Sequence, residues 1–329
     1  MEGLKSRNPL KVRNFKGISA STLQLILLIV ALAGLSTAAS FIMPGFLTFR
    51  HIMTLLYGYT MLGILALAET LIILTGNIDI SLGAIYWITI MYGAILMNGK
   101  ELWIPLLICI SLGALLGLIN GFGIAYLRIP SIVMTLAMLI ALTGVLYVTT
   151  GGGGHGRAAP ELISFTTGRI YGIPNIVLVW IILVIILEFM LRRTVLGWKI
   201  RTIGSNSTAS YLTGINVNRI ILLVFSLSGI LASIAGLFYL GWARTPYPTF
   251  QAGAGVGARI TLDAIAATIL GGTSFYGGRG SFVRTFLGTL VLAISFSILT
   301  MSGLGWTWKM IFSGLIMLIV VGLYSKYKT

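Results

Sequence analysis

Residues 65–98 read LALAETLIILTGNIDISLGAIYWITIMYGAILMN, which is two apolar segments interrupted at Gly76-Asn77-Ile78-Asp79. Polar residues between segments of this hydrophobicity are costly in a bilayer unless the backbone breaks there and lines protein or water. Many transporters build their pathways from helices broken near functional polar groups. The stretch therefore predicts a helix break inside a membrane transport protein.

The composition supports a membrane protein and argues against several other classes. Hydrophobic residues make up 57% of the 329 and charged residues only 9%, whereas soluble domains carry about 25% charged residues. The net charge of +15 comes from short loops between apolar spans, the pattern that sets membrane orientation. No basic patch is interleaved with aromatic residues, so we expect no nucleic-acid partner.

Cysteine and histidine give no sign of a metal site. Cys109 is the single cysteine and lies in an apolar run, which rules out an intrachain disulfide. His51 and His155 are far apart and have no cysteine companions. We therefore expect no bound metal.

Ten apolar segments are long enough, or nearly so, to cross a membrane. The eighth is too short for an ordinary span and is interpreted as a half-helix or as starting earlier. The segments are Leu23–Met43, Thr54–Thr75, Ile80–Asn98, Leu102–Tyr126, Ser131–Thr150, Asn175–Leu191, Ile220–Trp242, Leu262–Gly272, Phe282–Ser302 and Trp306–Ser325. The first resembles a signal peptide behind a basic tail, but it is long enough to span and is better interpreted as a retained helix.

Charge placement predicts the orientation. With a cytoplasmic N-terminus, 15 of the 22 Lys and Arg residues fall inside and 7 outside, as the positive-inside rule favours. The predicted fold is an all-α polytopic membrane protein of about ten spans, with broken or half helices and both termini cytoplasmic. Residues 1–20 form a basic tail, 21–325 one transmembrane domain, and 326–329 a short basic tail.

The loop 192–219, RRTVLGWKIRTIGSNSTASYLTGINVNR, is the one sizeable cytoplasmic excursion. Ser205 and Asn206 are good N-caps for a short helix over Ser207–Thr213, and Gly214 can end it. The helix could dock on a cytosolic partner, or the loop could rest on anionic lipid headgroups through its basic residues. The candidate docking residues are Gly204, Ser205, Asn206, Ser207, Ala209, Tyr211, Leu212 and Gly214.

A second glycine-rich interruption, ILGGTSFYGGRGS, covers Ile269–Ser281. Its glycines permit tight turns and close backbone approach, so it could be a hinge, a pathway lining or a compact turn between helices.

The acidic residues and Asn120 need individual interpretation, and for Asn120 a packing hydrogen bond across helices is favoured at least as much as a pathway role. Glu69 lies within the second span and should face protein or water. Glu188 should pair with Arg192, and Asp263 more readily pairs with Arg259 than contacts a substrate. For Asp79 a structural cap on the following helix is expected. The candidate pathway residues are Glu69, Gly76, Asn77, Asp79, Ser81, Asn120, Asp263, Gly271 and Gly272.

Four ordered motifs resemble one known family. ALAETLIILTGNIDISLGA, GLINGFGIAYLRIPSIVMTLAM, the 192–219 loop and LDAIAATILGGTSFYGGRGS are similar to the permease subunits of ribose/xylose/galactoside-type ABC importers. The resemblance implies a second permease copy or paralogue, a pair of cytosolic ATPase subunits using ATP and Mg²⁺, and an external or periplasmic solute-binding protein. It also implies that the 192–219 loop docks on the ATPase.

The chain departs from that family at three positions. The family commonly has an uncharged residue at Glu69, often a Gly at Asn77, and often a Glu at Thr261. These differences could mark an altered substrate, an unusual partner or neutral drift.

The sequence thus predicts a permease subunit in the cell membrane that imports a monosaccharide or sugar-like solute. The chain has no GxxxxGK[ST] phosphate loop, so it is not expected to be an enzyme or to hold a cofactor. A nucleoside or a furanone-like signal molecule is an alternative cargo. An ion-coupled secondary transporter using Glu69 and Asp79 is the alternative from another class.

Overall fold

The computed structural model describes residues 20–246, 255–305, 307–315 and 318. Seven helices in these ranges are long and apolar enough to cross a membrane. They are α1 (Ala20–Ile42), α2 (Phe49–Leu74), α4 (Trp103–Ala125), α5 (Ser131–Thr150), α7 (Asn175–Arg193), α10 (Val217–Ala243) and α12 (Phe282–Met301). Two shorter helices, α3 (Leu82–Met97) and α11 (Gly255–Leu270), pack among them. The polytopic membrane fold is confirmed.

The predicted segments from Leu23–Met43 to Phe282–Ser302 each overlap one of these helices. The eighth begins earlier than its apolar run, since α11 starts at Gly255. Of the tenth, residues 307–315 are helical and most of the remainder lies outside the described residues, as do both tails. The count of ten crossings and the side of the termini stay predictions.

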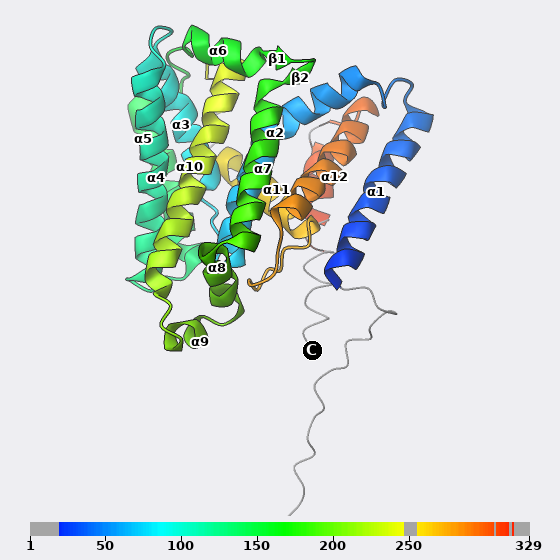
Figure 1. Cartoon of the computed structure of the whole chain (residues 1–329). Helices are drawn as coiled ribbons and strands as arrows, with labels where there is room; N and C mark the ends of the chain where they lie inside the picture. The colour runs from blue at the N-terminus through cyan, green and yellow to red at the C-terminus, as the bar shows by residue number, and fades with distance from the viewer. Residues whose placement is uncertain (1–19, 247–254, 306, 316–317, 319–329) are drawn as a thin grey trace, which may run out of the picture.

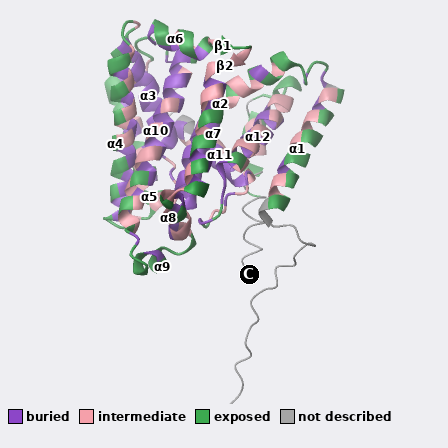
Figure 2. Cartoon of the chain, in the orientation of Figure 1, coloured by how far each residue is buried: buried purple, intermediate pink, exposed green. Residues whose placement is uncertain are grey.

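The core is centred on α2, whose residues from Thr60 to Leu74 are all buried. Figure 2 shows this buried centre and the exposed outer faces of α1, α4 and α7. Small residues let helices approach closely: a Cβ atom at Gly117 of α4 would lie 2.1 Å from the Phe225 carbonyl oxygen of α10. Such contacts replace the hydrophobic driving force that is missing between helices in lipid.

Threonine hydroxyls tie α11 and α12 to α2. Thr70 and Thr285 share a hydrogen bond of 2.7 Å, and Thr268 donates to the Ala66 carbonyl at 2.9 Å. All three hydroxyls are buried, so each satisfies a polar group within the bundle.

The two ends of the bundle carry different short elements (Figure 1). One end has α6 (Pro160–Thr167) and a hairpin of β1 (Arg169–Ile170) and β2 (Ile173–Pro174), in which Ile170 pairs with Ile173. The opposite end has α8 (Val195–Ser205) and α9 (Ser207–Leu212). The bundle therefore separates two surfaces that carry different short elements.

Candidate functional site

The predicted helix break lies between α2 and α3. Helix α2 ends at Leu74, the chain turns through Gly76 at φ +80°, and α3 begins at Leu82. A positive φ favours glycine because a side chain is strained there. Asn77 lies in the turn, where its side-chain amide donates to the Thr75 hydroxyl at 3.0 Å.

Asp79, Ser81 and Asn120 form a buried polar cluster at the break. One carboxylate oxygen of Asp79 accepts from the Ser81 N–H at 2.7 Å and from the Ser81 hydroxyl at 2.6 Å. The Asn120 amide on α4 donates to the Ser81 hydroxyl at 2.8 Å and to the other Asp79 oxygen at 3.4 Å. The cluster joins the start of α3 to α4. Asp79 is not the cap that the sequence predicted, because the N-cap residue of α3 is Ser81; Asp79 instead accepts from the N–H and the hydroxyl of that residue.

Helix α5 satisfies backbone groups that the break releases. The Ile78 N–H donates to the Ser131 hydroxyl at 3.3 Å, and the Ile80 N–H donates to the Thr135 hydroxyl at 3.1 Å. Broken backbone inside a membrane needs partners of this kind. The sequence analysis missed Ser131 and Thr135, because they lie 53 and 55 residues from Ile78 and Ile80 and only the packing of α5 brings them to the break.

Glu69 is fully buried on α2. The group that acts on its carboxylate is Asp79, through the backbone N–H as a hydrogen-bond donor and through the carboxylate electrostatically. Glu69 faces protein, as expected, but the described residues place no basic group in an ion pair with it.

Three glycine-bearing motifs meet at the C-terminal end of α2. The Leu74 carbonyl accepts from the Gly278 N–H at 3.0 Å. A Cβ atom at Gly204 of α8 would lie 1.9 Å from that same oxygen, and one at Gly277 would lie 2.8 Å from the Gly76 nitrogen. The 192–219 loop, the helix break and the second glycine-rich interruption are therefore in direct backbone contact.

Gly271 and Gly272 lie at the end of α11, apart from the polar cluster. A Cβ atom at Gly271 would approach the Arg284 carbonyl oxygen to 2.7 Å, and Gly272 has φ +77°. These contacts with α12 fit the compact-turn interpretation of Ile269–Ser281.

Asp263 also lies away from the cluster. Its carboxylate accepts from the Ser313 hydroxyl at 2.7 Å, and Arg259 attracts it electrostatically from four residues earlier. Thr261 accepts from the Gly83 N–H at 2.8 Å and so joins α11 to the start of α3.

Glu188 forms the predicted ion pair with Arg192 and has a further role. Its carboxylate also accepts from the Phe282 N–H at 2.7 Å and from the Ser281 hydroxyl at 3.0 Å. Ser281 is the N-cap of α12, so Glu188 places a negative charge at a helix N-terminus, where the helix dipole favours it. The spacing to Arg192 could not reveal this contact.

The predicted short helix of the 192–219 loop is α9. Asn206 is its N-cap and accepts from the Ala209 N–H at 2.9 Å, while Gly214 follows it at φ +82°. The N-cap prediction for Ser205 was wrong, because this residue ends α8 and its hydroxyl donates to the Arg201 carbonyl at 2.9 Å. The side chains of Tyr211 and Leu212 are 71% and 79% exposed.

Ser207 and Ala209 are also exposed on α9, whereas the side chain of Ser210 faces inward. An exposed Leu beside an exposed Tyr is an apolar surface at the outermost point of this end of the bundle. It is suited to packing into a groove on a partner.

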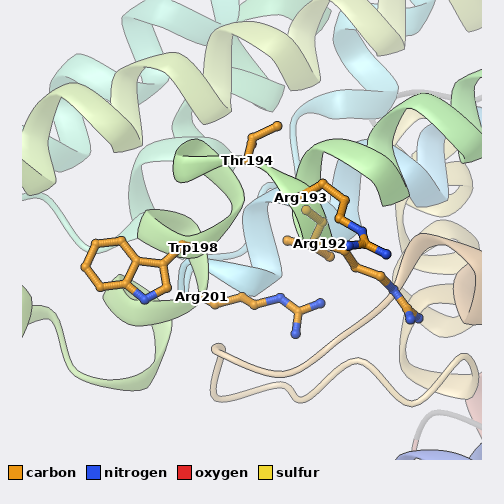
Figure 3. A pocket seen from close by; sticks show the side chains of 6 residues that line it. Arg192, Arg193, Thr194, Trp198 and Arg201 are labelled. Carbon is orange, nitrogen blue, oxygen red and sulfur yellow. The ribbon is translucent and has the colours of Figure 1, made fainter.

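A basic cavity of about 420 Å³ adjoins α8 (Figure 3). Burial lowers the pKa of Arg201, and the negative charge of Glu188 opposes that shift. Trp198 and the arginines give this surface the composition of a membrane–water interface. The lining residues are Leu191, Arg192, Arg193, Thr194, Trp198 and Arg201.

Residues 51–321 match the family described as branched-chain amino acid transport system / permease component. The chain belongs to this permease family. It is 35% identical over 312 residues to the ribose import permease protein RbsC of Escherichia coli, covering 92% of each chain. It is 32% identical to RbsC of Haemophilus influenzae, covering 89% of this chain and 90% of that one.

A permease named for a different cargo is similar to the chain to about the same degree. The autoinducer 2 import system permease protein LsrC of Enterobacter sp. is 33% identical over 307 residues, covering 93% of this chain and 87% of that one. No solved structure matches the chain.

Proposed function

We propose that this chain is the membrane-spanning subunit of an ABC importer for a monosaccharide or sugar-like solute. The observation that carries the proposal is its similarity to ribose import permeases over 92% of both chains. The chain has no phosphate loop of its own, so a pair of cytosolic partner subunits binds ATP and Mg²⁺ and hydrolyses the ATP. The assembly lies in the cell membrane and contains a second permease subunit, identical or paralogous.

The two ends of the bundle receive different partners in this proposal. The exposed Tyr211 and Leu212 of α9 dock into the ATPase. A loaded solute-binding protein docks at the opposite end, near α6 and the hairpin (Figure 1). ATP-driven closure of the ATPase pair then moves α8 and α9, and the two permease subunits swing to alternate access.

Asp79, Ser81 and Asn120 hold the broken-helix geometry beside the pathway. Full burial and mutual hydrogen bonds support a structural role, because the Asp79 carboxylate accepts hydrogen bonds from Ser81 and Asn120, the other two members of the cluster. Asn77 and Gly76 supply the turn itself.

A furanone-like signal molecule is a second candidate cargo. The similarity to an autoinducer 2 permease, at 33% identity over 93% of this chain, favours it. An ABC mechanism and the same partners would serve either cargo.

Uptake measurements test the proposal. Cells that lack the chain are supplied with it and with its cognate ATPase and binding protein, and are then given labelled D-ribose, D-xylose, D-galactose and autoinducer 2. We expect restored uptake of at least one of these solutes. If none of the four solutes is taken up, the assigned cargo class is contradicted.

A further inference from the structure

The basic cavity beside α8 has no part in the proposed import mechanism. It has a volume of about 420 Å³ and lies where α7 ends and α8 begins. Figure 3 shows arginine side chains from both helices at this cavity. Arg192 and Arg193 belong to the last turn of α7, and Arg201 belongs to α8. Positive charge from two helices therefore converges on one surface.

This positive charge is only partly neutralised by the protein. Arg192 forms an ion pair with Glu188, whereas Arg193 forms none with a described residue. Arg201 donates from Nη2 to the Gly280 carbonyl at 3.5 Å, and its buried Nε has no hydrogen-bond partner in the described part of the chain. Three guanidinium groups against one carboxylate leave two positive charges at the cavity.

The surroundings of Arg201 favour the entry of an anion. Burial lowers the pKa of Arg201, the Glu188 carboxylate opposes this shift, and the positive charge of Arg192 adds to it. Guanidinium groups nevertheless stay protonated in proteins, so the repulsion between the two arginines persists until an anion offsets it. Guanidinium groups bind phosphate oxygens through pairs of parallel N–H donors. The cavity is therefore suited to a phosphate group.

The arginines at the end of α7 lie at the depth of lipid headgroups. Helix α7 has 19 residues and rises about 28 Å, close to the hydrocarbon thickness of about 30 Å. When α7 crosses the membrane, its last turn therefore lies where the hydrocarbon core meets the headgroups. Trp198 on α8 lines the same cavity and is 56% exposed, and tryptophan is enriched at this depth.

An exposed apolar stripe on α7 leads directly to these arginines. Its side chains follow one another at helical spacing, so they share one face of the helix. They are Ile182, Ile185, Ile186 and Phe189. Arg192 and Arg193 come three and four residues after Phe189 and continue that face. A phospholipid has the same arrangement, because its acyl chains are joined to a phosphate, whereas a free phosphate would use the arginines alone.

We infer that this cavity binds the headgroup of an anionic phospholipid from the leaflet at the α8 end of the bundle. The phosphate diester accepts hydrogen bonds from Arg193 and Arg201, and an acyl chain lies along the α7 stripe. Basic pockets at membrane helices bind anionic headgroups in this way. The bound lipid ties α8 to the membrane surface, while the exposed side chains of α9 stay free for a cytosolic partner.

The test is lipid binding to the delipidated complete complex in neutral detergent. Tritiated dioctanoyl phosphatidylglycerol is the probe, and its binding is measured by scintillation proximity. Unlabelled phosphatidylglycerol should displace it, whereas zwitterionic dioctanoyl phosphatidylcholine and inorganic phosphate should each need at least tenfold higher concentrations. Displacement by inorganic phosphate at the same concentration as phosphatidylglycerol would contradict a lipid site, and equal displacement by phosphatidylcholine would contradict a site for anionic headgroups.

Variants locate the binding at the cavity. Arg193→Gln and Arg201→Gln should each weaken phosphatidylglycerol binding about tenfold, because each removes charge-assisted hydrogen bonds. Arg128→Gln is the control, since Arg128 is exposed on the loop between α4 and α5 and does not line the cavity. It should bind as the unsubstituted complex does.

Unchanged lipid affinity in Arg193→Gln would overturn the inference. If Arg201→Gln does not assemble with its partners, Arg193→Gln decides, because its side chain is exposed and its removal disturbs no packing. Loss of the ATPase from Arg193→Gln with lipid binding intact would also overturn the inference and assign the cavity to the ATPase interface. No transport is measured, so the result does not depend on the cargo.

Discussion

Gly204 of α8 lies directly against Leu74, the last residue of α2. A Cβ atom at Gly204 would be 1.9 Å from the Leu74 carbonyl oxygen and 2.4 Å from the Gly278 nitrogen. Backbone meets backbone here, so no flexible side chain absorbs a displacement of α8. In the proposed importer, a movement of α8 would therefore displace the helix break directly.

This contact predicts that Gly204→Ala uncouples transport. The added methyl group must push two backbone segments apart, and overpacking of this kind costs about 1–3 kcal/mol. Uptake should fall about tenfold while the chain still inserts and binds its ATPase. Gly144→Ala in α5 is the matched control, because nothing lies within 4 Å of a Cβ atom there. Equal uptake in the two variants would remove the transmission role of Gly204.

The α9 surface predicts a second uncoupled variant. The side chain of Leu212 is 79% exposed in this chain and should lose its contact with water in the ATPase groove. Leu212→Glu would place a charge in that groove, where an unpaired charge is unfavourable. Membrane insertion should be normal, while transport and solute-stimulated ATP hydrolysis are lost. A charged residue at Gly214 should act similarly. Leu212→Met should retain both activities, and full transport by Leu212→Glu would remove the docking assignment.

Substitution of Asp79 should change the rate of uptake rather than the selectivity between sugars. Asp79→Ala leaves the buried Ser81 N–H without its acceptor, a loss of about 1–3 kcal/mol. Uptake of every accepted sugar should therefore fall, with the ratios between sugars nearly constant. Asp79→Asn should be milder because an amide oxygen can still accept. The measurement is uptake of the sugar panel, and a selective loss of one sugar would point to direct substrate contact.

Thiol labelling in intact cells checks the orientation. In a Cys109→Ser background, single cysteines introduced at Ser205 and Ser164 are treated with a membrane-impermeant reagent. Both positions are exposed, at opposite ends of the bundle. The cysteine at position 164 should react and the one at 205 should be protected until the membrane is opened. Labelling at 205 from outside would reverse the topology.

Local signals in the sequence were enough for the spans and for α9. Apolar run length located the long helices, and the Asn206 cap and the Gly214 stop located the short one, because these signals act within a few residues. The short helix α6 was missed, since eight residues with a weak apolar pattern resemble a loop.

Contacts between distant residues could not be predicted from the sequence. Ser131 lies 53 residues from its partner Ile78, and Glu188 lies 94 from Phe282. The meeting of Gly204, Leu74 and Gly278 likewise depends on how three separate segments pack. The amino-acid sequence shows which residues are polar or small, whereas only the packed helices show which other residues they contact.

The ABC mechanism is tested most directly by measuring whether ATP or an ion gradient drives uptake. Proteoliposomes holding the complex are loaded with ATP, supplied with binding protein and labelled sugar, and compared with and without ionophores that collapse proton and sodium gradients. Uptake should require ATP, persist with ionophores and be nearly unchanged in Glu69→Gln. Uptake that proceeds without ATP, stops with ionophores and is abolished by Glu69→Gln would contradict the ABC mechanism and establish an ion-coupled transporter.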